Sequence, residues 1–399
     1  MAGVAIETNQ VSGARLGRVT LALFMAGFAT FSLIYSTQPL LGELARQFRL
    51  DPATSSLALS ATTATLAVSI LAMGALSESF GRRGLMFASM GAAAVLNLAC
   101  ALAPTWTALV GERAIEGLAL GGVPATAMAY LAEEIPPQRL GFAMGLYVSG
   151  NAFGGMAGRV AVGALTQLWG WRAALGSVSA LDLAAALAFV LLLPASRNFA
   201  ARRGLALRAH FAAWGGHLLR PGLAMLFAVG FLSMGSFVSV YNYIGFRLAA
   251  PPYGLSQGQI GLIFLTYLIG MAASSWAGAL ADRFGRARVL SLGAVIALAG
   301  LALTLAPPLA LIALGVAGLT AGFFVAHSVA SGWVGHLALT NRSLASSLYL
   351  LAYYLGASVM GSAGGAAWHW AGWTALTAYC AAGMLAVLAI GVALGRTAR

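Results

Sequence analysis

Twelve long, continuously apolar stretches dominate this chain of 399 residues. A helix needs roughly 20 apolar residues to cross a bilayer, and each stretch is about that long or longer. The stretches cover residues 19–40, 55–77, 84–103, 106–131, 139–168, 172–193, 220–248, 256–280, 287–305, 308–335, 342–368 and 372–394. They lack the short alternating runs of membrane strands, so we predict an all-α membrane protein with twelve transmembrane helices.

Charged residues are scarce and unevenly distributed. Only 8% of the residues are charged, against roughly a quarter in soluble domains, so much of the surface must face lipid. Sixteen of the 22 basic residues, all arginines, fall on segments at the side of the two termini. This bias predicts that both termini lie in the cytoplasm. It also accounts for the net charge of +12 without a nucleic-acid partner.

The sequence contains an internal repeat. "GALSESFGRRGL" at 74–85 returns as "GALADRFGRARVL" at 278–290, and "LFMAGF" at 23–28 returns as "LFAVGF" at 226–231. We therefore predict two six-helix bundles, residues 1–193 and 220–399, joined by a cytoplasmic linker at 194–219. Because six spans return the chain to the same side, the halves should be parallel repeats about an axis along the membrane normal.

These motifs resemble those of the major facilitator superfamily of secondary transporters, over essentially the whole chain. The doubled loop resembles its signature between the second and third helices of a half. "RAIEG" at 113–117 resembles the fourth-helix motif of its proton-coupled antiporters, and "GNAFGGMAGR" at 150–159 resembles their fifth-helix motif without the customary proline.

The resemblance implies the major facilitator fold and secondary active transport. It favours proton-coupled efflux of small organic molecules by alternating access, in a bacterial inner membrane, by a monomer without a cofactor. A proton-symport importer or a facilitator of a sugar or metabolite would use the same fold and stays open as an alternative. A sensor or an embedded enzyme is the alternative from another class.

The doubled loop predicts a cytoplasmic latch between halves that rock against each other. A carboxylate at a helix N-terminus gains about 0.3–1 kcal/mol from the helix dipole. In the outward-open state we expect Glu78 to face the start of the eleventh helix near Arg342, and Asp282 to face the start of the fifth near Arg139. The latch set is Gly74, Glu78, Gly81, Arg82, Arg83, Gly278, Asp282, Arg283, Gly285, Arg286, Arg139 and Arg342. The alternative is that these arginines only set the topology.

Ionisable residues inside the spans form a second cluster, since a charge in a membrane is costly unless it is paired or hydrated. The candidates for proton coupling are Arg113, Glu116, Asp182 and Arg159. Arg113 and Glu116 are three residues apart on one helix and hence neighbours. Arg159 either pairs with Asp182 or binds an anionic substrate. The alternative is that these groups are structural ion pairs.

Candidate substrate contacts lie on helices expected to line the pore: Tyr35, Gln38, Tyr241, Asn242 and His327. Aromatic and amide groups at nearly equivalent positions of both halves suit a mostly apolar cavity. Pro39 should break or bend the first helix. The alternatives are an aromatic belt at the membrane surface for the tyrosines and a packing role for His327.

Gly150, Gly154 and Gly158 share one helical face and predict close helix packing, which we expect against the eighth or tenth helix. The five histidines and two cysteines show no metal-ligand or nucleophile–base spacing, and no nucleotide-binding loop occurs. We therefore expect no metal, no cofactor and no enzymatic activity. His210 and His217 are expected at the surface of the linker. The predicted partners are a small-molecule substrate, protons and the lipid bilayer.

Overall fold

The computed structural model describes residues 13–196, 214–338 and 340–397, and every regular element in these ranges is a helix. Most of the predicted linker, residues 197–213, lies outside the described residues, and so does His210. The side chain of Glu78 is also outside the described part.

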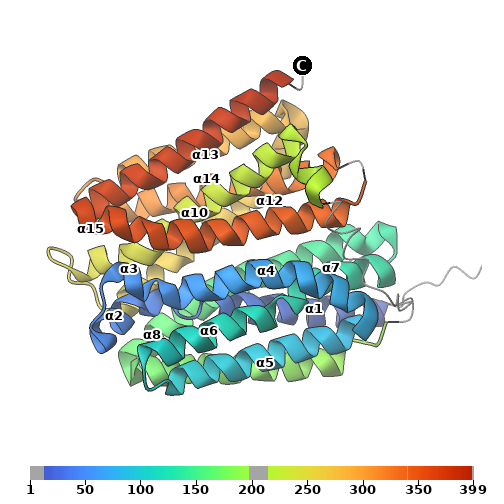
Figure 1. Cartoon of the computed structure of the whole chain (residues 1–399), viewed down its shortest axis with the longest axis horizontal. Helices are drawn as coiled ribbons and strands as arrows, with labels where there is room; N and C mark the ends of the chain where they lie inside the picture. Colours follow the sequence, from blue (N-terminus) through green and yellow to red (C-terminus); the bar gives the residue numbers. More distant parts are fainter. Residues whose placement is uncertain (1–12, 197–213, 339, 398–399) are drawn as a thin grey trace, which may run out of the picture.

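The helices form two bundles, drawn one above the other in Figure 1. The lower bundle contains α1 (Gly13–Tyr35), η1 (Gln38–Leu40), α2 (Leu41–Phe48), α3 (Pro52–Ser55), α4 (Leu57–Phe80), α5 (Arg82–Leu102), α6 (Trp106–Leu120), α7 (Gly122–Glu134) and α8 (Pro137–Leu192). The upper bundle contains α10 (Pro221–Ala249), α11 (Gln257–Gly261), η2 (Leu262–Thr266), α12 (Tyr267–Phe284), α13 (Arg286–Leu303), α14 (Leu309–Leu337) and α15 (Arg342–Thr397).

The helices account for all twelve predicted spans. Nine segments of the described chain are long and apolar enough to cross a bilayer. Two of them, Gln138–Leu192 and Arg342–Arg396, break from helical geometry at Gly170 and at Ala371 and Gly372, so each contains two predicted spans. A shorter apolar stretch, Leu57–Met73, supplies the remaining one. The all-α fold with two six-helix halves is confirmed.

The first helix is shorter than its apolar stretch predicted. α1 ends at Tyr35, and Pro39 lies in the short 3₁₀ helix η1 instead of extending α1. Proline has no backbone N–H and cannot continue an α-helical ladder, so the predicted break is confirmed. The break turns Gln38 into the protein interior, where it is 3% exposed.

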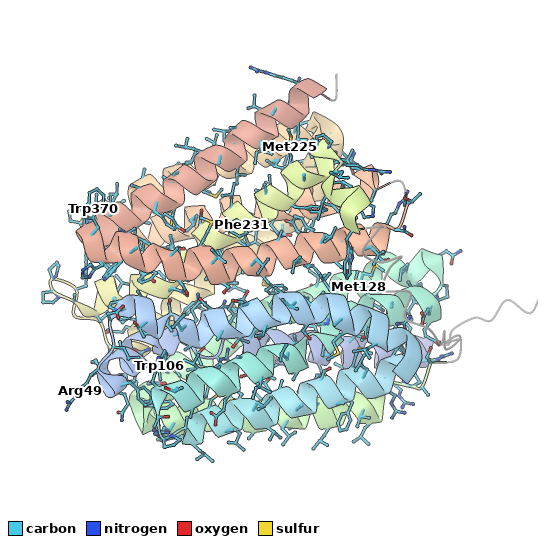
Figure 2. The ribbon with its side chains drawn as sticks, viewed as in Figure 1. Arg49, Trp106, Met128, Met225, Phe231 and Trp370 are labelled. Carbon is cyan, nitrogen blue, oxygen red and sulfur yellow. The ribbon has the colours of Figure 1, made fainter. Side chains whose placement is uncertain are left out.

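The two halves meet along two pairs of helices. α4 packs against α15, as Figure 1 shows, and α8 packs against α11. We call the end where α1 begins and α15 ends the terminal end, which is on the right in Figure 1. The opposite end, which carries α2 and α3, is the far end. Figure 2 places Arg49 and Trp370 at this far end.

The three glycines of the fifth span pack against a different helix from the one expected. A Cβ atom at Gly150, Gly154 or Gly158 would collide with atoms of α1 in the same half. The prediction of close packing is confirmed, but the expected contact with the eighth or tenth helix is wrong. Small side chains identify a close approach without identifying the partner helix, since any neighbouring backbone can use the space.

The repeat is visible in this packing. A Cβ at Gly154 would meet the carbonyl oxygen of Phe28, and a Cβ at Gly356 would meet the carbonyl oxygen of Phe231, which is labelled in Figure 2. These two contacts are equivalent in the two halves. Each half therefore joins its first and fifth helices through the same glycine-on-backbone contact.

Replacing Gly154 with alanine should destabilise the protein by about 1–3 kcal/mol, because overpacking displaces α1. Gly145 is the matched control, since it lies on the same helix and a Cβ there meets nothing within 4 Å. The thermal unfolding midpoint in detergent should fall for Gly154→Ala and not for Gly145→Ala. Equal midpoints for both variants would contradict the packing.

Candidate functional site

Arg113 donates hydrogen bonds to the carbonyl groups at the break that ends the first helix. Where α1 ends inside the protein, its last carbonyl groups have no helical partners. Arg113 of α6 is fully buried and donates from Nη1 to the Leu33 oxygen at 3.1 Å and from Nη2 to the Ile34 oxygen at 2.6 Å. Its Nε donates to the Ala58 oxygen of α4 at 2.9 Å. One guanidinium thus joins three helices, and its charge is favourable at a helix C-terminus.

Glu116 balances this buried charge. Its Oε2 accepts a hydrogen bond from Arg113 Nη1 at 2.6 Å, and both side chains are fully buried. The predicted contact between these neighbours is confirmed. The other oxygen, Oε1, has no hydrogen-bond partner among the described residues.

Asp182 is a fully buried acid on the second part of α8. Neither of its carboxyl oxygens has a hydrogen-bond partner within the described ranges. The Ser32 hydroxyl is close enough for a loose hydrogen bond to it, outside good hydrogen-bond geometry, and the Glu116 carboxyl is close enough to interact with it electrostatically. Asp182 and Glu116 thus form a pair of acids with unsatisfied oxygens in the interior of the first half.

Arg159 lies apart from these acids, at the contact between the halves. Its Nε donates to Gln38 Oε1 at 2.7 Å, and its Nη1 donates to the Gly155 oxygen at 2.7 Å. The guanidinium carbon lies 3.9 Å from the ring centroid of Tyr35 and 4.8 Å from that of Tyr267 in the other half. Of the two alternatives for Arg159, the ion pair with Asp182 is not formed.

Two of the predicted cavity residues form a hydrogen bond across the halves. Gln38 Nε2 donates to Asn242 Oδ1 at 2.8 Å, and the two residues are 204 positions apart. That separation is the offset between the sequence repeats, so the two amides lie on either side of the pseudo-twofold axis. Together with Arg159 they make a polar chain between the halves.

Further contacts between the halves follow the far end of α4, and the sequence did not identify them. The Ser362 hydroxyl donates to Ser60 Oγ at 2.7 Å, and the Ser358 hydroxyl donates to the Ser60 carbonyl oxygen at 2.9 Å. A Cβ on Gly163 of α8 would lie 3.0 Å from the Cα of Gly261 in α11. The run "GSAGGAA" at 361–367 was the available signal, because runs of small residues favour close helix contacts.

Two other cavity candidates, Tyr241 and His327, pack inside the second half. The Tyr241 hydroxyl hydrogen-bonds to Thr266 Oγ1 at 2.6 Å and to Thr320 Oγ1 at 2.8 Å. His327 Nδ1 lies 2.8 Å from the Tyr349 hydroxyl. These contacts support the packing alternative for His327.

Several of the described latch residues have a partner within their own half. Arg82 pairs with Glu133 at 2.6 Å, and Asp282 pairs with Arg286 at 3.8 Å. Arg342 donates to the carbonyl oxygen of Ala338. A groove lies between the halves on the terminal side in this structure, whereas the latch was expected in the state with the terminal end closed. The contacts of Asp282 with Arg139 and of Glu78 with the region of Arg342 therefore stay predictions.

A groove separates the halves on the terminal side of these contacts. It has a volume of about 670 Å³ and lies between α8 and α12, with Ser149 and Ser275 among its lining residues. Most of its wall is apolar, including Phe142 and Phe324.

The halves are thus in contact around Gln38 and Ser60, and this groove lies on the terminal side of that contact. A second hollow between the halves, of about 800 Å³, lies at the far end beside Arg49 and Ala249.

The expectation that His217 lies at the surface is wrong. The residue is 3% exposed, and neither ring nitrogen has a hydrogen-bond partner within the described chain. It lies in the short helical turn before α10, where its side chain is buried although Leu218 and Leu219 beside it are exposed.

The helix arrangement and the inter-half contacts can be compared with known proteins. The family model of the Major Facilitator Superfamily matches residues 20–252, which is more than half of the chain. The chain belongs to the major facilitator superfamily.

Close relatives of this superfamily member extend over nearly its whole length. It is 46% identical over 358 residues to the uncharacterized MFS-type transporter YybF of Bacillus subtilis, covering 89% of this chain and 88% of the relative. It is 44% identical over 381 residues to the inner membrane transport protein YnfM of Escherichia coli, covering 95% and 91%. The chain is thus a multi-pass membrane transporter, and it is not an enzyme.

Solved structures share the fold at low sequence identity. The nucleoside transporter NupG matches with a TM-score of 0.75 at 15% identity, covering 95% of this chain and 99% of that chain. A bacterial homolog of the lysosomal transporter Spinster, in an inward-facing and unoccupied conformation, matches with a TM-score of 0.71 at 16% identity, covering 96% and 95%. These matches confirm the major facilitator fold.

Removing Arg113 should be more harmful than removing the whole ion pair. Arg113→Gln leaves Glu116 as an unpaired buried charge and should cost about 3–5 kcal/mol of stability. Adding Glu116→Gln removes that charge and should recover part of the loss. Thermal unfolding of the single and double variants in detergent measures both effects. A double variant less stable than Arg113→Gln would contradict this account.

Proposed function

We propose that this transporter exports small organic molecules across the bacterial inner membrane in exchange for protons. The observation that carries the proposal is the pair of buried acids, Glu116 and Asp182: Glu116 Oε1 and both carboxyl oxygens of Asp182 have no hydrogen-bond partner among the described residues. A buried carboxyl group can take a proton from one side of the membrane and release it to the other when the access changes. Such groups mark proton pathways in transporters.

The proposed orientation places the terminal end in the cytoplasm. Arginines concentrate on the segments at this end, as the positive-inside rule requires. With this orientation, the contacts around Gln38 and Ser60 separate the groove between α8 and α12, which lies toward the cytoplasm, from the hollow at the far end, which lies toward the periplasm. The conformation is then inward-facing, in which cargo enters from the cytoplasm.

A facilitator or a proton-symport importer is the second candidate. One observation favours a facilitator: Arg113 uses its donors on backbone carbonyls of α1 and α4, so its pair with Glu116 has a sufficient structural reason. Of the two buried acids, only Asp182 would then lack such a structural reason. Dependence of transport on the proton gradient separates the exporter from a facilitator, and the direction of substrate movement separates it from a proton symporter.

The alternating-access part of the proposal predicts that the latch holds the terminal end closed. We expect a cysteine pair at Ser149 and Ser275, on opposite walls of the groove, to cross-link when the halves approach there. In a background with Cys100 and Cys380 replaced by alanine, Glu78→Gln with Asp282→Asn should lower the cross-linking. Loss of the two dipole contacts should change the ratio of closed to open molecules by about threefold or more.

Glu43→Gln is the control for that experiment, because Glu43 pairs with Arg46 at the far end. It should leave the cross-linking yield of the Ser149 and Ser275 positions unchanged. An unchanged yield in the latch variant would remove the latch from the mechanism.

The proton-coupling part predicts the behaviour of an Asp182→Asn, Glu116→Gln double variant. Cells that overproduce the wild-type protein should resist some members of a panel of drugs, sugars and metabolites, and a protonophore should abolish this resistance. The double variant should give no protection at equal membrane abundance, since neither neutral side chain can exchange a proton. Glu43→Gln should protect as the wild type does.

Full protection by the double variant would show that these two acids are not the carriers. Protection that a protonophore leaves intact would favour the facilitator.

A further inference from the structure

Arg159 is a buried cation without an acidic partner in the described part of the chain. The residue is 1% exposed, and its two hydrogen-bond acceptors, Gln38 Oε1 and the Gly155 carbonyl oxygen, are neutral. Its Nη2 forms no hydrogen bond to a described residue. An unpaired charge inside a membrane protein is costly, so an uncompensated arginine at the contact between the halves indicates a missing anion.

Aromatic rings from both halves surround this guanidinium. Its carbon lies 3.9 Å from the ring centroid of Tyr35 in α1, 4.8 Å from that of Tyr267 in α12 and 5.3 Å from that of Phe264 in η2. Tyr353 and Tyr354 of α15 lie near enough to Tyr35 to interact with it. Cation–π contacts partly offset the burial of the charge, but they supply no negative charge.

Neighbouring donors also lack acceptors. The Tyr35 hydroxyl and Asn242 Nδ2 are buried, and within the described ranges neither has a hydrogen-bond partner. Asn242 is tied through Gln38 to Arg159, so both donors belong to the Arg159 cluster. A buried donor without an acceptor loses its hydration without replacement, and a ligand with acceptor oxygens would restore it.

Arg159 has no charged equivalent in the second half, although the surrounding helices are repeated there. "LYVSGNAFGG" at 146–155 corresponds to "LYLLAYYLGA" at 348–357, so Arg159 corresponds to Gly361 in the second half. A Cβ on Gly361 would lie 3.3 Å from Asn242 Nδ2. The pseudo-symmetric centre therefore holds one cation, opposite a residue without a side chain.

We propose that Arg159 binds the carboxylate of the transported substrate, and that the substrates are organic monoanions with a flat apolar body, such as aromatic carboxylates. This inference rests on the proposed transport function. A carboxylate matches the planar donor pattern of a guanidinium. The rings of Tyr35, Tyr267 and Phe264 suit a flat apolar body. One cation balances one negative charge, so a dianion would keep an unpaired charge in a dry site.

Isothermal titration calorimetry on the full-length protein in detergent tests the substrate class. The probes are benzoate, phenylacetate and 4-hydroxybenzoate, with benzamide as the neutral isostere and benzylamine as the cation. At least one carboxylate should bind the wild type about tenfold or more tightly than benzamide does, because a charged hydrogen bond is lost in the amide. Arg159→Gln should weaken carboxylate binding by a similar factor, and Arg159→Lys should weaken it less.

Arg46→Gln is the matched control, since it removes an arginine whose side chain is 76% exposed and paired with Glu43. It should bind the carboxylates as the wild type does. The wild-type comparison of benzoate with benzamide needs no variant, so instability of Arg159→Gln cannot hide the answer. The inference is overturned if no carboxylate binds, if benzamide or benzylamine binds as tightly, or if a folded Arg159→Gln protein retains full affinity.

Failure of this inference can be told apart from failure of the transport proposal. The cysteine cross-linking at Ser149 and Ser275 reports the change of access without any substrate. A wild-type protein that changes access but binds no carboxylate overturns the substrate class alone. A protein that binds carboxylates and never changes access contradicts the transport cycle.

Discussion

The structure depends on how one broken helix satisfies its backbone inside a membrane protein. Hydrocarbon offers no hydrogen bonds, so a helix that ends in the interior must find donors for its last carbonyls within the protein. Arg113 provides these donors to Leu33 and Ile34, and it binds α4 at the same time. A neutral donor would satisfy fewer carbonyls and would lack the attraction of a cation to the helix C-terminus. The cost of burying that cation explains why Glu116 lies beside it.

The break after α1 determines which residues meet at the contact between the halves. Because α1 stops at Tyr35, Gln38 turns inward and meets Asn242 from the equivalent position of the other half. Equivalent amides can bond across a pseudo-twofold axis because an amide both donates and accepts. Two guanidinium groups placed there would repel each other. In this chain Arg159 of the first half instead corresponds to Gly361 of the second half. The duplication thus accounts for the matched helices and glycine contacts. The single buried cation at the contact between the halves, Arg159, departs from the symmetry.

The sequence predicted the scaffold better than the site. Long apolar runs and the repeat offset predicted twelve helices in two halves, because the bilayer allows few other solutions for such runs. Helical spacing predicted the pair of Arg113 and Glu116. Spacing could not identify partners on other helices: Gly154 packs against Phe28 of α1, and Arg159 meets Gln38 and not Asp182. Such contacts depend on how the helices rotate and tilt in the bundle, which the periodicity of a single helix does not encode.

The charge of the cargo connects the proposed substrate class with the proposed direction of transport. Moving one elementary charge across 100 mV is worth about 2.3 kcal/mol. When a monoanion leaves a cell with a negative interior and a proton enters, two charges move in favourable directions, and the membrane potential contributes about twice that amount. Import of the same anion with one proton moves no net charge and gains nothing from the potential. A neutral cargo would benefit from the potential only through the proton. The proposed monoanionic cargo and the proposed export in exchange for a proton are therefore energetically consistent with each other.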